Sequence, residues 1–205
     1  MRRHPIYLDA YLSSLNMVVN ALEKNKDVTT HFYVFLYVAT GLRERVLDLT
    51  ESNFDLVNNV FFPRSYLKYN QNSDIKMHMH PSFSKIVLAY IKKMRIPNGE
   101  KLLDIQKPSY FNPYIPKTCH YDSNKIVFSL ASTLLLQTYN PRLVAKVLFL
   151  NKQYISFVAK SNGLLITGDI MYKEGREVTP KEELYHPHMW LELEKAKAVT
   201  KNGRV

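Results

Sequence analysis

The sequence predicts a mainly α-helical α+β protein with one small antiparallel β-sheet. Apolar residues recur at helical spacing in several long segments, and one stretch, from Val60 to Met79, is typical of strands. Prolines and glycines fall between these segments rather than inside them. The 205 residues are of single-domain size and contain no internal repeat. We therefore expect one domain over residues 1–205.

The N-terminal part predicts two helices. The first runs from about Tyr7 to Glu23 and carries its apolar residues on one face. Residues 1–26 either belong to the main domain or are the remnant of a linker to a further domain. The next segment, Phe32 to Ala39, is continuously apolar and aromatic, which predicts a buried helix. Thr40 and Gly41 end it.

The second half predicts further helices separated by a Pro- and Tyr-rich connection. Helices are expected over Ser82–Met94, Lys125–Tyr139 and Pro141–Leu150, and Pro141 suits the first turn of its helix. The connection from Lys107 to Tyr121 is expected to be irregular because prolines interrupt it. In the tail, residues 179–205, the run Thr179-Pro180-Lys181-Glu182 predicts a capping box that opens a helix ending at Lys197.

Charge is the main compositional signal of function. The chain has 28 Lys and Arg against 18 Asp and Glu, a formal net charge of +10. Such an excess attracts polyanions and makes their binding sensitive to salt. No apolar run approaches the roughly 20 residues that a membrane span requires, and no signal peptide opens the chain. We expect an intracellular protein of a bacterial, archaeal or viral host cell, with no membrane partner.

One arginine stands at a position suited to binding a phosphate. Arg43 follows Gly41 directly behind the buried Phe32–Ala39 run and opens an amphipathic segment. A planar guanidinium donates two parallel hydrogen bonds to phosphate oxygens, so an arginine on a rigid base suits phosphodiester binding. The alternative is an ion pair of Arg43 with Glu44 or Asp48 on its own helix.

The segment around Arg43 resembles the first conserved box of the tyrosine recombinases, the phage integrase family. The resemblance lies in Thr40-Gly41-Leu42-Arg43 followed by Leu47-x-Leu49-Thr50-x-x-x-Phe54-Asp55, and it extends from about Asp27 to Ser161. It implies the catalytic-domain fold of that family, with Arg43 on the scissile phosphate of DNA. The stretch Val60–His80 is similar to the family's small sheet, which places Lys68 at the position of its catalytic lysine.

The later boxes depart from the family pattern. In the family, His-x-x-Arg precedes the helix after the connection, and here Lys125 and Phe128 occupy those positions. The Leu-Gly-His motif is replaced by Leu148-Phe149-Leu150-Asn151, and the nucleophilic tyrosine position falls on Lys160 or Ser161. Tyr154 comes too early and Tyr172 too late. Removing one positioned charge donor from such a site costs about 10²–10³ in rate, so the joint loss predicts that strand cleavage is absent.

The leading hypothesis is a protein of recombinase-like fold that binds double-stranded DNA and has lost cleavage. Phosphate contacts position a duplex without reading its sequence. For each basic residue the alternative is a solvated surface charge. The candidate DNA-binding residues are Arg43, Arg45, Arg64, Lys68, Lys76, Lys125, Arg142, Lys146 and Lys152.

Two other functions stay open. A divergent, active recombinase would use Tyr172 or Tyr154 to form a covalent 3′-phosphotyrosine, with Lys125 replacing a lost basic group. An assembly protein would use the C-terminal helix, Thr179–Lys197, to dock on a neighbouring copy of the chain, with Met189, Trp190 and Leu193 as apolar anchors. The alternative for that helix is packing on its own core.

No cofactor or metal is expected. His78 and His80 alternate on a predicted strand, and His186 and His188 form a second pair, but neither pair has a third ligand nearby in sequence. We interpret these histidines as structural or surface residues. The one cysteine, Cys119, excludes an internal disulfide, and the chain contains no Gly-rich phosphate loop.

Overall fold

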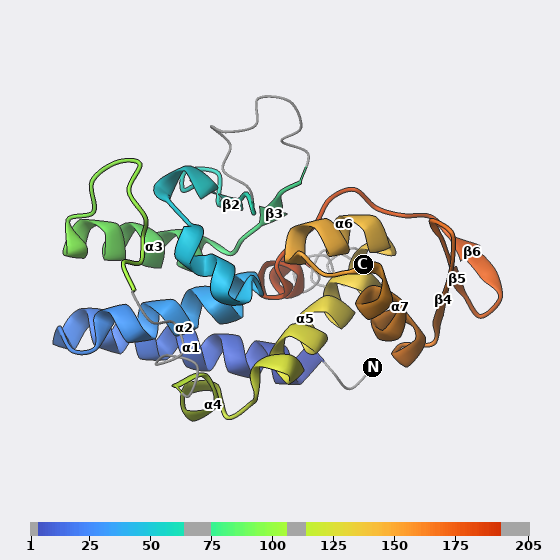
Figure 1. Ribbon diagram of the computed structural model, residues 1–205, viewed down its shortest axis with the longest axis horizontal. Helices are drawn as coiled ribbons and strands as arrows, with labels where there is room; N and C mark the ends of the chain where they lie inside the picture. The colour runs from blue at the N-terminus through green and yellow to red at the C-terminus, as the bar shows by residue number, and fades with distance from the viewer. Residues whose placement is uncertain (1–3, 64–74, 106–113, 194–205) are drawn as a thin grey trace, which may run out of the picture.

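Helix α2 forms the centre of the molecule in the computed structural model, which describes residues 4–63, 75–105 and 114–193. Helix α1 lies alongside it (Figure 1). The helices are α1 (His4–Lys24), α2 (Val28–Thr40), α3 (Pro81–Met94), α4 (Tyr114–Cys119), α5 (Ser123–Thr138), α6 (Pro141–Leu148), α7 (Lys152–Ser161) and one over 187–193, with 3₁₀ helices η1 (Arg43–Asp48) and η2 (Glu51–Asn53). The strands are β1 (Phe54–Asp55), β2 (Val60–Phe61), β3 (Met77–His78), β4 (Leu164–Thr167), β5 (Ile170–Lys173) and β6 (Arg176–Val178).

The α+β class and the main helices are confirmed. Every residue of α2 from Phe32 to Thr40 is buried, as the continuous apolar run predicts. The ring of Phe32 stacks on Tyr90 of α3 with 3.6 Å between ring centroids. Asn140 caps α6 by accepting the backbone N–H of Leu143, so the Asn-Pro start of that helix acts as expected.

Gly41 ends α2 in the left-handed conformation, with φ at +68°. Its N–H donates to the carbonyl of Tyr37, which closes the last turn of the helix. A Cβ at this position would lie 2.8 Å from Cδ2 of Leu130 and 3.1 Å from Cδ2 of Leu148. Glycine is therefore required both by the backbone and by the close approach of α5 and α6.

The described part of the chain contains two small antiparallel sheets where one was expected. The first has the order β1-β2-β3, with Phe54 opposite Phe61 and Val60 opposite His78. The second, β4-β5-β6, lies at the end of the molecule beyond α7 (Figure 1). The turns at Gly168-Asp169 and Glu174-Gly175 that join its strands are visible in the sequence, but this sheet and α7 were not predicted.

The expectation of a capped helix from Thr179 was wrong. The capping box does not form, and residues 179–184 have no regular secondary structure. The N–H of Lys181 donates to the Thr138 carbonyl at 2.7 Å, and the N–H of His186 donates to the His78 carbonyl at 2.8 Å. These long-range bonds replace the local helix, which starts only at residue 187.

The Pro-rich connection was expected to be irregular throughout, yet it contains α4. Pro116 lies in the first turn of that helix, where a missing N–H removes no helical hydrogen bond. The segment after Gly41 is the short 3₁₀ helix η1 rather than a longer amphipathic helix.

The C-terminal segment packs on its own core. Leu184 and His186 are buried, and Tyr185 forms a β-bridge with His78. Trp190 is half-buried on the helix over 187–193. This is the alternative to intermolecular docking, and the homo-oligomer stays a prediction.

Candidate nucleic-acid interface

The helices α5, α6 and α7 belong to a segment without negative charge. Between Ser123 and Gly168 the sequence has no Asp or Glu, whereas it has Lys125, Arg142, Lys146, Lys152 and Lys160. All five of these side chains are exposed. Four of them were predicted singly as DNA-binding residues, and this acid-free stretch is the signal that would have grouped them and added Lys160.

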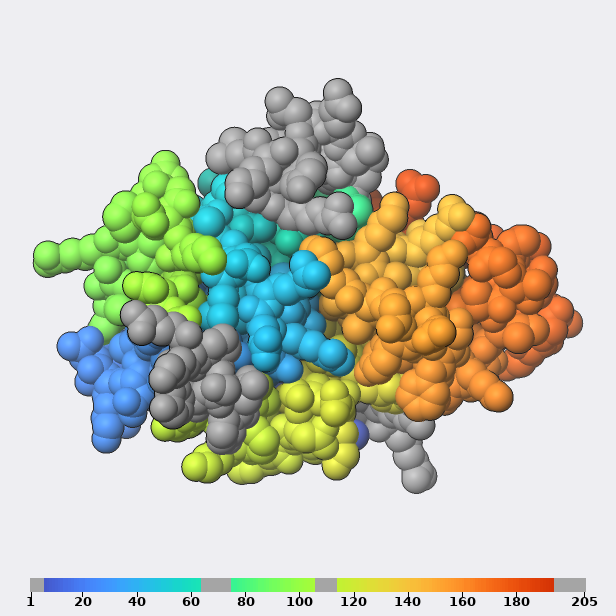
Figure 2. Space-filling view, in the orientation of Figure 1, coloured from blue at the N-terminus to red at the C-terminus, as the bar shows by residue number. Residues whose placement is uncertain are grey.

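The 3₁₀ helix η1 adds two arginines to this surface. The guanidinium carbon of Arg45 lies 4.4 Å from the ring centroid of Phe149, the residue that follows α6. In Figure 2 the η1 segment (cyan) directly adjoins α6 and α7 (orange) on the visible face. We call the exposed side chains of Arg43, Arg45, Arg142, Lys146 and Lys152 the basic face.

Arg43 and Arg45 line a surface hollow of about 620 Å³. The hollow lies between η1, the start of α5 and the end of α6. Arg43 has a φ of +55° and is exposed, so the turn after Gly41 presents it to solvent as the sequence predicts. Glu44 and Asp122 also line the hollow, so its charge is mixed.

Tyr154 is the nucleophile candidate that the structure brings close to Arg43. Burial raises the pKa of the Tyr154 phenol, and the positive charge of Arg43 opposes that rise. Burial likewise raises the pKa of Tyr37, which lines the hollow of Arg43 and Arg45. Tyr172 instead lies on β5, opposite Leu165 and Glu177 in the second sheet. The structure thus separates the two tyrosine candidates.

A second hollow, of about 340 Å³, gathers three predicted DNA-binding residues. Arg142, Lys146 and Lys152 line it together with the β4–β5 turn. The Arg142 guanidinium holds both carboxylate oxygens of Asp169 in that turn, with Nε donating to Oδ1 at 2.6 Å. Both side chains are largely exposed, so this ion pair ties the hairpin to α6 without burying charge.

The other predicted contacts are not part of the basic face. Lys125 pairs with Asp122, the N-cap of its own helix, at 3.4 Å. Arg64 and Lys68 lie outside the described residues. Lys76 lines a different hollow, of about 1030 Å³, which shares no residue with the two hollows of the basic face.

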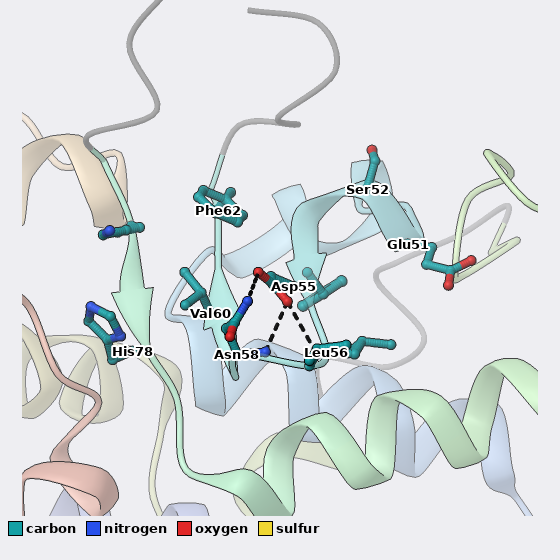
Figure 3. Close-up of a pocket in the computed structure, with 11 residues that line it drawn as sticks. Glu51, Ser52, Asp55, Leu56, Asn58, Val60, Phe62 and His78 are labelled. Carbon is teal, nitrogen blue, oxygen red and sulfur yellow. Dashed lines mark hydrogen bonds between the residues drawn. The ribbon is translucent and has the colours of Figure 1, made fainter. Parts of the chain in front are cut away.

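The hollow that contains Lys76 lies beside the first sheet (Figure 3). Its carboxylates are Glu51 and Asp55. Asp55 accepts hydrogen bonds from the backbone and side chain of Asn58, which lowers its pKa and shows that it shapes the β1–β2 turn. Two carboxylates against one lysine do not favour a phosphate here.

The histidines form ring contacts at the C-terminal segment. His78 stacks on Tyr185 with 5.0 Å between centroids, and His80 stacks on His188 at 4.0 Å. The expectation that His78 and His80 share a strand was wrong, because His80 caps α3 by accepting the N–H of Ser82. Within residues 4–63, 75–105 and 114–193, no three His, Cys, Asp or Glu side chains are placed to hold a metal ion.

Cys119 is buried, and burial raises the pKa of its thiol to about 12. A thiol that stays protonated is a poor nucleophile. None of the helices in the described part of the chain is both long and apolar enough to cross a membrane.

These features define an α+β protein in which η1, α6 and α7 present exposed basic side chains around two surface hollows. The chain is 31% identical over 193 residues to the uncharacterized protein ORF213 of Acidianus two-tailed virus, and the alignment covers 91% of this chain and 90% of that protein. The chain belongs to the family of this viral protein. No family model and no solved structure matches the sequence.

Proposed function

We propose that the protein binds double-stranded DNA through the basic face and does not cut it. The observation that carries the proposal is the placement of exposed basic side chains: those of α6 and α7 come from a segment without Asp or Glu, and Arg45 of η1 contacts Phe149 at the end of α6. A surface of this kind neutralises phosphates and releases their counterions. Contacts from Arg43, Lys146 and Lys152 would fix the position of the duplex.

A degenerate recombinase-like catalytic domain is part of the same proposal. The support is Arg43, which follows Gly41 at the end of a buried helix and is exposed for a phosphate, as the resemblance implies. At the positions of the family's second basic motif, Lys125 is paired with Asp122, and Phe128 packs on Phe157 with ring centroids 5.6 Å apart. Phe128 carries no charge, so it does not replace the second arginine.

The proposed absence of cleavage is supported by the state of Tyr154. Attack on a phosphodiester requires a phenolate or a base that removes the phenol proton. A tyrosine phenol is protonated at neutral pH even at its ordinary pKa of about 10, and burial raises the pKa of Tyr154 further despite the neighbouring Arg43. The proximity of Tyr154 to Arg43 is also the one observation that favours the divergent recombinase as a second candidate.

DNA binding is tested by gel shift of a labelled duplex over a salt series. The double variant Lys146→Ala/Lys152→Ala removes two charges from the basic face. Its matched control, Lys85→Ala/Lys92→Ala, removes two exposed lysines from α3, at the opposite end of the molecule (Figure 1). We expect the first variant alone to weaken binding and to reduce the slope of log K against log salt by about 0.9 per lost contact. No shift at low salt, or equal losses in both variants, would contradict the proposal.

Loss of cleavage is tested with nicked suicide duplexes on denaturing gels. We expect no complex that survives SDS. A surviving adduct that disappears in Tyr154→Phe, and persists in Tyr172→Phe, would establish the divergent recombinase instead. The two variants are matched because each removes one phenol oxygen, and only Tyr154 lies close to Arg43.

A further inference from the structure

Helices α6 and α7 are joined by a short, well-formed turn. The turn comprises Phe149, Leu150 and Asn151, since α6 ends at Leu148 and α7 begins at Lys152. Phe149 takes the left-handed conformation with φ at +52°, and its N–H donates to the Ala145 carbonyl. Asn151 then caps α7 by accepting the N–H of Tyr154 at 2.7 Å. The turn is therefore held at both ends.

The two helices pack with α5 into a three-helix unit. Val144 and Val147 of α6 and Ile155 and Val158 of α7 are buried in the common core. Asn162, at the end of α7, donates to Ser132 of α5 at 3.1 Å. These contacts hold α7 firmly, so that its outward face is presented on a rigid base.

The outward face of α7 is free of negative charge and polar except for Phe157. Its exposed residues are Lys152, Gln153, Ser156, Phe157, Lys160 and Ser161. They recur at the spacing of one helix face and alternate with the buried Ile155, Val158 and Ala159. Lysine, glutamine and serine side chains are the donors and acceptors that read base edges in the major groove.

A β-hairpin follows α7 directly. Strands β4 and β5 turn at Gly168-Asp169, and Arg142 of α6 holds that turn through Asp169. The hairpin lies beside α7 in Figure 1, and its turn lines the same hollow as Lys146 and Lys152. The hairpin is thus fixed relative to both helices.

We propose that α6 and α7 form a helix-turn-helix that reads DNA sequence, with α7 in the major groove and Gln153 directed at base edges. A three-residue turn between two helices, and a second helix whose exposed face carries hydrogen-bonding side chains, are features of that motif. Arg43 and Arg45 flank the turn through the Arg45–Phe149 contact and are placed to bind phosphates beside the groove. This inference rests on the proposed DNA binding and adds sequence specificity to it.

Selection from a pool of randomised duplexes tests the inference. The full chain is incubated with the pool at moderate salt, and bound duplexes are amplified and sequenced. We expect one motif to be enriched. We expect Gln153→Ala to weaken binding to the enriched duplex by about 10-fold and to relax the preference at one base pair, since a bidentate glutamine–adenine contact discriminates by about that much.

Lys146→Ala is the matched control for a backbone contact. It should weaken binding to enriched and random duplexes equally. Both side chains are exposed, so the thermal unfolding temperature of each variant should equal that of the parent protein. DNA bound without any enriched motif, or equal effects of Gln153→Ala on all duplexes, would overturn the helix-turn-helix and leave the proposed function standing. A pool from which nothing is bound, even at low salt, would overturn both.

Discussion

The hydroxyl of Tyr7 and Nε2 of His186 lie 2.7 Å apart in the core, although 179 positions separate the two residues in the sequence. The Tyr7 hydroxyl also donates to the carbonyls of Val38 and Ala39, in the last turn of α2. Because Nδ1 of His186 accepts the N–H of His188, the ring proton lies on Nε2 and is donated to Tyr7. This chain of bonds connects the C-terminal segment to the helix end that precedes Arg43.

The protein should lose stability as the pH falls through the range below about 6.5. Complete burial, with the nearby His188 and His80, holds the pKa of His186 well below its ordinary value of about 6.5. The unfolded chain therefore binds a proton at a pH at which folded His186 does not, so the free energy of unfolding decreases with falling pH. Burial also lowers the pKa values of His78 and His80, which act in the same direction. Urea unfolding between pH 7.5 and 5 measures the effect.

The variant His186→Gln isolates the contribution of His186 to the pH dependence of stability. It should be less stable than the parent protein at pH 7.5 but should lose less further stability on acidification, because glutamine does not titrate. The control His120→Asn changes an exposed histidine and should keep the parent's pH dependence. If the free energy of unfolding falls equally with pH in His186→Gln and in the parent protein, burial of His186 does not cause the pH dependence.

Tyr7→Phe should destabilise the fold by about 1–3 kcal/mol. The substitution keeps the packed ring but leaves buried polar groups of His186 and the end of α2 without their partner. Tyr114→Phe removes the same oxygen from a side chain that is 45% exposed and should change stability by less than about 0.5 kcal/mol. Chemical denaturation of both variants measures the difference, and equal values would show that the hydroxyl of Tyr7 contributes nothing.

The long helices were predictable because their signals are local. The apolar run of α2, the glycine that ends it and the Asn-Pro start of α6 each act within a few residues. The Thr179 capping box failed for the opposite reason. The backbone donors of Lys181 and His186 are taken by Thr138 and His78, and nothing near residue 179 announces those partners.

The candidate interface was predictable only where its signals are local. Arg43 was found from its own neighbours, and Arg142, Lys146 and Lys152 were named one by one. Their assembly around one hollow depends on how α6, α7 and the β4–β5 turn pack together. Lys76 was named on equal grounds, yet the first sheet carries it to a separate hollow. The sign of each charge can be read from the residue itself, whereas the face of the molecule on which that charge lies depends on how the elements pack.

Gly41→Ala should destabilise the protein more than a Gly→Ala change at a position where the added Cβ meets no neighbouring atom. Alanine at a φ of +68° is strained by about 1 kcal/mol, and its Cβ would also overlap Leu130 at 2.8 Å. Gly163→Ala is the matched control, because it has a φ of +71° and nothing within 4 Å of the added Cβ. Thermal unfolding should show a loss of about 1 kcal/mol for Gly163→Ala and at least about 2 kcal/mol for Gly41→Ala. Equal losses would mean that the close approach of Leu130 relaxes freely.

Asp169→Asn should tighten DNA binding while leaving stability nearly unchanged. In the free protein the Asp169 carboxylate occupies the donors of Arg142 that a phosphate would use, and it repels the phosphate as well. The pair is exposed, so its loss should change the free energy of unfolding by less than about 1 kcal/mol. Glu100→Gln removes an exposed carboxylate from the loop after α3, away from the basic face, and should leave the affinity unchanged apart from a small effect of net charge. Titration of one duplex at fixed salt compares the two variants. If Asp169→Asn binds no more tightly than Glu100→Gln, Arg142 does not contact the phosphates, and its role is to hold the β4–β5 turn against α6.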